Sequence, residues 1–284
     1  MAKPAFLVVG AQRAGTTWLD RHLRAHPEVY LPLRRKEIHY FDRFYDRGPE
    51  WYESFFPRGK EAARYRAIGE ITPKYLFDRI APERIRRDLP DVRLVAILRN
   101  PVDRAYSQYA LAVRDAGERG TFEEFVRDNP DVVGRGLYTR QLERYLGCFP
   151  RDRFLVLLFE EMMADAATTL RRIAKFLDID PGPFEKPHDR GKVNASYRPR
   201  YPGVRATVRK VGDFLRYHDL DWFVNVAKEM GVPHLFGNAG PLPPLTEGAR
   251  RRLTGIFEDD VAALERLLGK ELPEWKTARE TITA

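Results

Sequence analysis

The segment from Gly10 to Thr17, Gly-Ala-Gln-Arg-Ala-Gly-Thr-Thr, has the composition and spacing of a phosphate-binding loop. Four residues separate its glycines, Gly10 and Gly15, and a helical pattern begins directly afterwards at Thr16. The backbone N–H groups of such a turn form a concave nest for an anion, and the N-terminus of the helix adds about half a positive charge. The segment therefore predicts an anion site, with a plain glycine-rich turn as the structural alternative.

The loop differs from those that bind ATP or GTP with Mg²⁺. Such loops carry a lysine after the second glycine, which reaches the β- and γ-phosphates, and then a hydroxyl that holds the metal. In this sequence Thr16 occupies the lysine position, and the only cationic residue of the loop is Arg13. This pattern favours a single phosphate that bears a small transferable group.

Apolar runs of strand length alternate with helical patterns around this loop. The runs that read as strands are Ala5–Val9, Ile68–Ile71, Val92–Leu98 and Arg153–Phe159, and the clearest helical patterns are Thr16–Ala25 and Val102–Arg114. Strands that alternate with helices indicate a parallel sheet. We therefore expect an α/β fold with a P-loop-like parallel sheet, helices on both of its faces and a C-terminal helical extension.

The pattern changes near Pro181, where prolines punctuate a polar, basic stretch. We interpret residues 185–200 as an ordered loop at the active site, because they retain Arg, Lys, Asn and Tyr. Residues 203–284 are expected to form the helical extension, with helices near Val204–Arg216, Leu220–Met230 and Glu247–Leu268. We predict one domain over 1–284, in which residues 5–200 form the nucleotide-binding core.

Composition narrows the class of protein further. The 284 residues carry a formal net charge of +8, which favours anionic partners, although much of this excess can be surface composition. A single cysteine, Cys148, excludes an intrachain disulfide and reads as a small core residue. The six histidines show no metal-ligand spacing, so no metal is expected. No signal peptide or membrane span is apparent, and a cytoplasmic protein is expected.

Several motifs occur in an order that resembles the PAPS-dependent sulfotransferase family, and within it the glycosaminoglycan (heparan sulfate)-type branch. After the loop come His26-Pro27 and a Glu-x-x-x-Phe element at Glu37–Phe41. A Trp-Tyr…Phe-Phe-Pro stretch spans Trp51–Pro57. Leu98-Arg99-Asn-Pro101 follows, with Arg104, Tyr106, Ser107 and Tyr109. The resemblance covers about residues 5–195.

The resemblance implies a sulfuryl transfer from PAPS to a hydroxyl or amine, with a carbohydrate-like acceptor favoured and PAP released. Glu37 corresponds to the general base of in-line attack, and Arg13 and His39 are the other catalytic candidates. Arg99 and Ser107 correspond to the residues that bind the 3′-phosphate. The remaining candidates for donor binding are the loop residues Gln12, Arg13, Ala14, Gly15, Thr16, Thr17 and Trp18, and a closing loop with Arg190, Gly191 and Lys192.

Each assignment has a structural alternative. Arg99 can simply cap a strand, and Ser107 can be an ordinary helix serine. Glu37 can be a solvated glutamate in a charge cluster, while His39, with Asp42 nearby, is as well explained by a structural role on a strand edge. The Arg190 loop can be a solvated basic turn.

Two departures from the family pattern affect the chemistry. The family has lysine where this chain has Arg13, and an arginine can stabilise a leaving phosphate but cannot donate a proton to it. The glycosaminoglycan branch also has a lysine where this chain has Ile71, after Glu70. Lys74 is close enough in sequence to be a substitute.

Two other classes of function compete with this interpretation. A kinase-like P-loop enzyme would need a cation at Thr16 and an acidic metal ligand after a strand, where Leu98 is followed by Arg99. A nucleic-acid-binding module is suggested by charge alone, without a docking motif. The expected partners are therefore PAPS and an acceptor, without nucleic acid.

Overall fold

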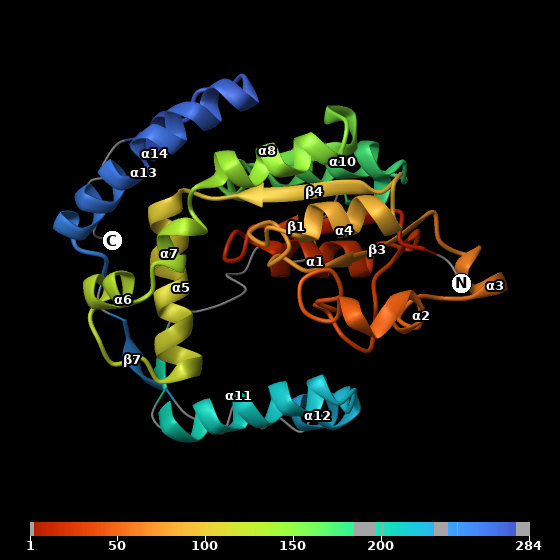
Figure 1. The fold of residues 1–284 in the computed structure, drawn as a ribbon, viewed down its shortest axis with the longest axis horizontal. Helices are drawn as coiled ribbons and strands as arrows, with labels where there is room; N and C mark the ends of the chain where they lie inside the picture. Colours follow the sequence, from red (N-terminus) through yellow and green to blue (C-terminus); the bar gives the residue numbers. More distant parts are fainter. Residues whose placement is uncertain (1–2, 185–196, 200–201, 230–237, 243, 277–284) are drawn as a thin grey trace. The chain divides into compact units, whose positions relative to one another are not determined.

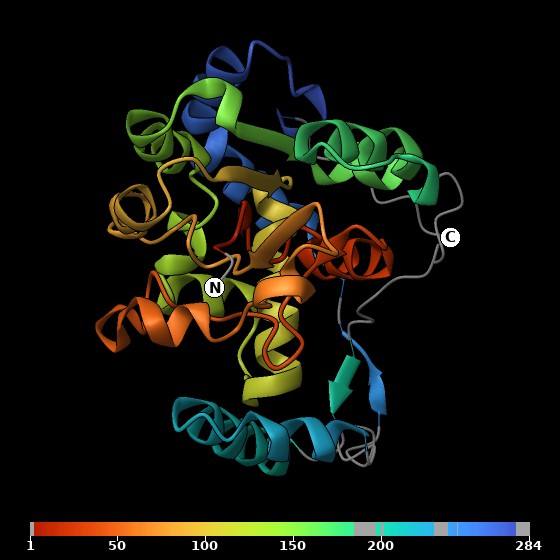
Figure 2. The ribbon, with the colours of Figure 1, turned by 90° about the vertical axis from the view of Figure 1, so that its right-hand side faces the viewer.

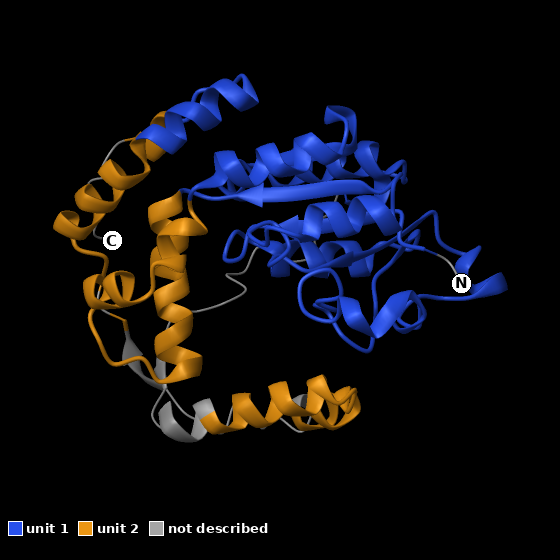
Figure 3. Cartoon of the chain, viewed as in Figure 1, with its two compact units in different colours: residues 1–100, 137–193, 259–272 blue, residues 101–136, 194–258, 273–284 orange. Residues whose placement is uncertain are grey.

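The computed structural model describes residues 3–184, 197–199, 202–229, 238–242 and 244–276. The chain divides into two compact units (Figure 3). The first unit contains residues 1–100, 137–193 and 259–272, and the second contains residues 101–136, 194–258 and 273–284. The predicted division at residues 5–200 and 203–284, within one domain, stays a prediction.

The first unit is built on a five-stranded parallel sheet in the order β2-β3-β1-β4-β5. The strands are β1 (Phe6–Gly10), β2 (Val29–Tyr30), β3 (Ala67–Ile71), β4 (Arg93–Leu98) and β5 (Phe154–Leu158). Every residue of β1 and β3 is buried, as expected for strands covered on both faces. Because β1 lies between β3 and β4, the segments that follow these three strands emerge at the same edge of the sheet.

Helices cover both faces of this sheet, with α4 and α8 on one side and α1 and α10 on the other (Figures 1 and 2). The helices of this unit are α1 (Thr16–Ala25), α2 (Gly48–Glu53), α3 (Gly59–Ala62), α4 (Ala81–Asp88), α8 (Tyr138–Cys148), α9 (Phe159–Ala164) and α10 (Ala166–Leu177). Helix α1 buries Trp18, Leu19 and Leu23, the apolar side of its pattern.

The second unit is mainly helical. It contains α5 (Pro101–Ala116), α6 (Phe122–Asp128), α7 (Asp131–Gly134), α11 (Pro202–Tyr217), α12 (Asp221–Glu229) and α14 (Pro273–Lys276), with β6 (Tyr197–Pro199) paired to β7 (Asn238–Pro241). Helix α13 (Glu247–Leu268) contributes to both units. Arg104 of α5 is fully buried and donates to Gln108 and to the carbonyl of Val132, so this motif residue ties α7 to α5.

The predicted fold class is confirmed, and the four predicted strands and their main helices are present. The structure adds the short β2 and the β6–β7 pair, which the sequence did not predict. His39 does not lie on a strand edge, because residues 37–39 form no strand. Cys148 is only partly buried, at the end of α8, which is less than a core position requires.

Candidate active site

The anion loop follows β1 and turns through two residues with left-handed backbone, Arg13 (φ 71°) and Gly15 (φ 90°). Its start is held to the neighbouring strand, because the Ala11 N–H donates to the Ile97 carbonyl over 2.7 Å. Gly15 is the N-cap of α1 and offers no side chain to the first N–H groups of the helix. The Trp18 N–H donates to the Gly15 carbonyl over 2.9 Å, while the N–H groups of Thr16 and Thr17 precede the first turn and are available to an anion.

Gly15 is required for space as well as for backbone conformation. A Cβ atom at this position would lie 2.5 Å from Cε of Met162 and 2.9 Å from Cδ2 of Phe159, both on α9. The loop therefore packs directly on the helix that follows β5. A side chain at Gly15 would require Met162 and Phe159 to move, or the loop to shift away from α9.

Arg99 lies where β4 ends, and it contacts the anion loop. Its Nη1 donates to the Arg13 carbonyl over 3.2 Å, and its guanidinium lies 4.5 Å from the centroid of the Phe159 ring. The hydroxyl of Tyr138 donates to the Arg99 carbonyl over 2.8 Å. Arg99 is thus held beside the loop by groups from three parts of the first unit, and its role in donor binding stays a prediction.

Lys36 brings an ammonium group to the loop that the sequence analysis did not identify. Its Nζ donates to Oγ1 of Thr17 over 2.9 Å. Burial lowers the pKa of Lys36 from its usual value, and the charges of Asp20 and Glu37 only partly oppose this. The segment that carries Glu37 therefore also supplies a lysine to the anion loop. In the sequence, only the position of Lys36 directly before Glu37 could have indicated this role.

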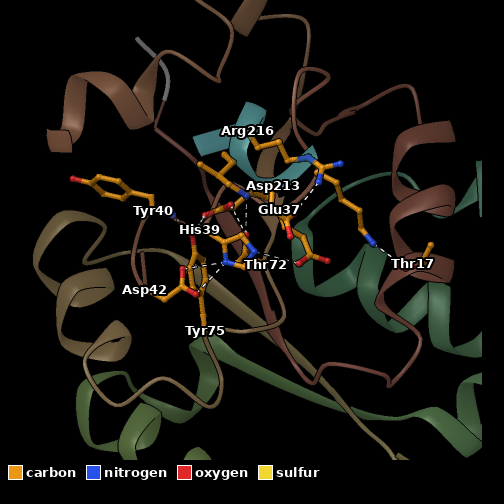
Figure 4. A network of polar contacts seen from close by, with 12 residues as sticks. Thr17, Glu37, His39, Tyr40, Asp42, Thr72, Tyr75, Asp213 and Arg216 are labelled. Atoms are coloured by element: carbon orange, nitrogen blue, oxygen red, sulfur yellow. Dashed lines mark hydrogen bonds and ion pairs between the residues drawn. The ribbon is translucent and has the colours of Figure 1, made fainter. Parts of the chain in front are cut away.

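Glu37, His39 and Asp42 form a line of ionisable groups (Figure 4). Nε2 of His39 lies 3.5 Å from Oε2 of Glu37, and Nδ1 lies 3.0 Å from Oδ2 of Asp42. The Glu37 side chain is 36% exposed, whereas that of Asp42 is 3% exposed. The exposed end of the line is thus Glu37, the predicted base, and the buried Asp42 orients the imidazole behind it.

The charge states of this line follow from its geometry. Burial disfavours the charged form of His39, but its hydrogen bonds with Asp42 and Glu37 outweigh this and raise the pKa to about 9. Burial would raise the pKa of Glu37, yet the hydrogen bond and charge of His39, with the charge of Lys36, hold it below its usual value. Glu37 is therefore an ionised carboxylate at neutral pH, and His39 is an imidazolium.

The other predicted residues lie in different surroundings. Ala14, Thr16 and Trp18 are buried, and the Trp18 ring lies 3.9 Å from that of His22 within α1. Ile71 is buried in β3, so it cannot act as the missing lysine. Gln12 and Thr17 are half-buried, and Lys74, also half-buried, follows β3.

Ser107 lies on α5 of the second unit, and its approach to Arg99 stays a prediction. Arg190, Gly191 and Lys192 lie outside the described residues. Within the described ranges, no three His, Cys, Asp or Glu side chains are grouped as a metal site would need. Across that same part of the chain, no helix combines the length and apolar character needed to span a membrane.

Comparison with known proteins identifies the family. A family model described as sulfotransferase domain matches residues 3–193. Heparan sulfate glucosamine 3-O-sulfotransferase 6 of Homo sapiens is 30% identical over 257 residues, which cover 80% of this chain and 73% of that protein. A bifunctional heparan sulfate N-deacetylase/N-sulfotransferase 3 of Homo sapiens is 30% identical over 296 residues, which cover 96% of this chain but 31% of that protein.

Solved structures agree with this assignment. A sulfotransferase crystal structure from Alicyclobacillus acidocaldarius has a TM-score of 0.70 and 27% identity, and the match covers 98% of this chain and 100% of that one. A sulfotransferase domain from the curacin biosynthetic pathway shares the fold, with a TM-score of 0.51. Family membership also decides against the kinase-like alternative. The chain therefore belongs to the sulfotransferase domain family, and it is a PAPS-dependent sulfotransferase.

Proposed function

We propose that this enzyme sulfates a hydroxyl or amine of a carbohydrate-like acceptor, with Glu37 as the general base. The observation that carries the proposal is the line of Glu37, His39 and Asp42, whose exposed carboxylate shares one segment with the loop-bound Lys36. A base must be ionised and within reach of the acceptor proton. The low pKa of Glu37 supports the first condition, and its exposure supports the second.

The transfer then proceeds in line. The acceptor oxygen or nitrogen forms a bond to sulfur while the bond between sulfur and the phosphate oxygen breaks, and Glu37 takes the acceptor proton. Negative charge develops on the departing phosphate of PAP, where the loop N–H groups, Arg13 and Lys36 would stabilise it. Lys36 can also give this phosphate a proton, which Arg13 cannot do.

A carbohydrate acceptor is favoured by the relatives. Their names assign heparan sulfate glucosamine to one and both N-deacetylation and N-sulfation of heparan sulfate to another, so oxygen and nitrogen acceptors both occur among them. The net charge of +8 also suits an acidic sugar chain. We further keep a cytoplasmic location and binding of the 3′-phosphate by Arg99 and Ser107 as predictions.

The deciding experiment is an acceptor screen with labelled PAPS, in which products are identified by mass. The panel contains N-acetylated and N-deacetylated heparan-type oligosaccharides, neutral oligosaccharides, and phenolic and lipid alcohols. We expect a mass gain of one sulfuryl group on a sugar hydroxyl or amine, formed about 10²- to 10⁴-fold more slowly when Glu37→Gln replaces the wild type. Transfer only to the phenolic or lipid alcohols would refute the carbohydrate assignment.

A further inference from the structure

Beneath the Glu37–His39 line lies a second carboxylate that the proposed mechanism does not use. Glu70 of β3 is 0% exposed, yet it has three hydroxyl donors. Its Oε1 accepts from Tyr52 over 2.9 Å and from Tyr75 over 3.1 Å, and its Oε2 accepts from Thr72 over 3.0 Å. A buried carboxylate with this many donors is an organised structure, because an unsatisfied one would be strongly destabilising.

Two of these hydroxyls also accept hydrogen bonds from backbone N–H groups of the segment that carries Glu37, the proposed base. Thr72 Oγ1 accepts the Ile38 N–H over 3.1 Å, and the Tyr75 hydroxyl accepts the Tyr40 N–H over 2.9 Å. These two N–H groups stand on either side of His39. Figure 4 shows Thr72 and Tyr75 beside the Glu37–Tyr40 segment.

The direction of each hydrogen bond depends on the carboxylate. An ionised carboxylate only accepts, so both hydroxyls must point their single hydrogen at Glu70 and their lone pairs remain for the backbone N–H groups. The segment needs this support, because it contains no strand or helix and its central residue, His39, has a φ of 60°. A backbone in that region persists only where its surroundings fix it.

We propose that Glu70 is a positioning residue, which orients the Glu37–His39 segment through two intervening hydroxyl groups. This inference rests on the proposed function only for its effect on turnover, because the orientation itself can be measured without an acceptor. Burial raises the pKa of Glu70 to about 7, although its three hydroxyl donors and the charge of His39 act in the opposite direction. Because the ionised carboxylate orients the two hydroxyls, their hydrogen bonds to the Glu37–His39 segment strengthen as pH rises through neutrality. The groups that face Glu70 are Tyr52 of α2, Thr72 and Tyr75 after β3, and His39.

Glu70→Gln tests the proposal, because the amide nearly keeps the shape but its nitrogen is a donor. The hydroxyl that faces this nitrogen then meets two N–H donors, one from the amide and one from the backbone. The hydrogen of that hydroxyl loses the carboxylate oxygen that accepted it. We expect the pKa of His39, followed by NMR with His39→Gln for assignment, to fall from about 9 towards 6.5. With an acceptor in hand, kcat should fall by about 10- to 100-fold, as displaced catalytic groups do, while the Kd for PAP stays unchanged.

Thr72→Val separates positioning from the charge of Glu70. This change removes one connecting hydroxyl at nearly constant shape and keeps the Glu70 carboxyl group, whose pKa rises because one of its donors is lost, so the two variants are compared at a pH where Glu70 is ionised in both. We expect the same fall in the His39 pKa as in Glu70→Gln, and its recovery in Thr72→Ser, which restores the hydroxyl. Ile68→Val, at a buried position of the same strand, is the control that lowers stability alone.

The outcomes are distinct. If Glu70→Gln lowers the His39 pKa but Thr72→Val does not, the coupling is direct electrostatics and positioning is wrong. If neither variant moves it beyond the Ile68→Val control, Glu70 is only structural. Failure of the proposed function would show differently, as full turnover in Glu37→Gln with the His39 titration still dependent on Glu70 and Thr72.

Discussion

At the scale of single residues, the two carboxylates beside His39 differ in exposure to solvent. Asp42 is buried and holds His39, while Glu37 at the open end keeps an exposed oxygen for an acceptor. A fully solvated glutamate would also be ionised at neutral pH, but no neighbouring side chain would fix the orientation of its carboxylate. The imidazolium thus has two effects on Glu37: it fixes the carboxylate in place, and it lowers the pKa and therefore the basicity of that group.

Glu37→Gln should lower kcat by about 10²- to 10⁴-fold, the usual effect of losing a positioned general base. The amide keeps the packing but cannot accept the proton, so PAP affinity and folding should be close to wild type. Turnover at saturating substrate and calorimetry with PAP measure both effects. Glu50→Gln, at an exposed glutamate of α2, is the matched control. If Glu37→Gln kept more than about a third of wild-type kcat, the base would have to be another group.

Lys36→Met should weaken PAP binding by about 1.5–3 kcal/mol, the size of a lost hydrogen bond from a charged group. Methionine approximates the apolar stem but removes the ammonium that contacts Thr17. Calorimetry with PAP detects the change, and Lys36→Arg should restore binding while leaving kcat reduced, since arginine cannot give up a proton. Lys60→Met on α3, at an exposed lysine, should have no effect; an equal loss there would mean that net charge alone is responsible.

At the scale of elements, the site residues of the first unit lie at one edge of the sheet, where its strands end. The anion loop follows β1, Thr72 and Tyr75 follow β3, and Arg99 follows β4, so three adjacent parallel strands deliver their next residues to one place. Helix α9 after β5 closes the set by packing on Gly15. The loop therefore depends on a neighbour that is distant in sequence.

Gly15→Ala should destabilise the protein by about 2–5 kcal/mol, because left-handed backbone costs about 1–2 kcal/mol and overpacking about 1–3 kcal/mol. The new methyl group would meet Met162 and Phe159, and Met162→Ala alone opens a cavity because that side chain is buried. Gly15→Ala combined with Met162→Ala should therefore cost less than the sum of the two single losses. Urea unfolding and PAP calorimetry measure the two consequences. Gly147→Ala on α8, where a Cβ meets nothing within 4 Å, should instead stabilise by about 1 kcal/mol. Similar losses in both variants would contradict the role of α9.

The sequence predicted the strands better than it predicted the helices and buried side chains that pack around them. Buried parallel strands are uninterrupted apolar runs, so β1 and β4 were located within a residue or two of their observed ends. Helix α8 was missed, although Tyr138, Leu142 and Tyr145 have helical spacing and are buried. The buried role of Glu70 was not predicted, because a carboxylate within a strand reads as a polar interruption and one of its three hydroxyl partners, Tyr52, is 18 residues away.

At the scale of the whole molecule, several buried or half-buried ionisable groups make stability depend on pH. The raised pKa of Glu70 means that the fold favours its protonated form, so this contribution is fully present below about 4.5 and is lost as pH rises through about 7. Glu37 has the opposite sign, because its lowered pKa contributes stability that is lost in acid. His39 gives a contribution whose loss lies above neutral pH.

His39 should contribute stability that is fully present below about pH 6.5, its ordinary pKa, and that is lost as pH rises through about 9. At about 1.4 kcal/mol for each pH unit between these values, the contribution is about 3–4 kcal/mol at most. The sign follows because the folded state, with Asp42 and Glu37 beside the ring, binds the proton more tightly than the unfolded chain does. Urea unfolding of wild type and His39→Gln between pH 6 and 10 measures it, and the difference between the two should shrink towards high pH. His218→Gln, at an exposed histidine of the second unit, is the control for the substitution itself. A constant difference for His39→Gln across this range would mean that the imidazole is held by packing, and that Glu37 works without an imidazolium behind it.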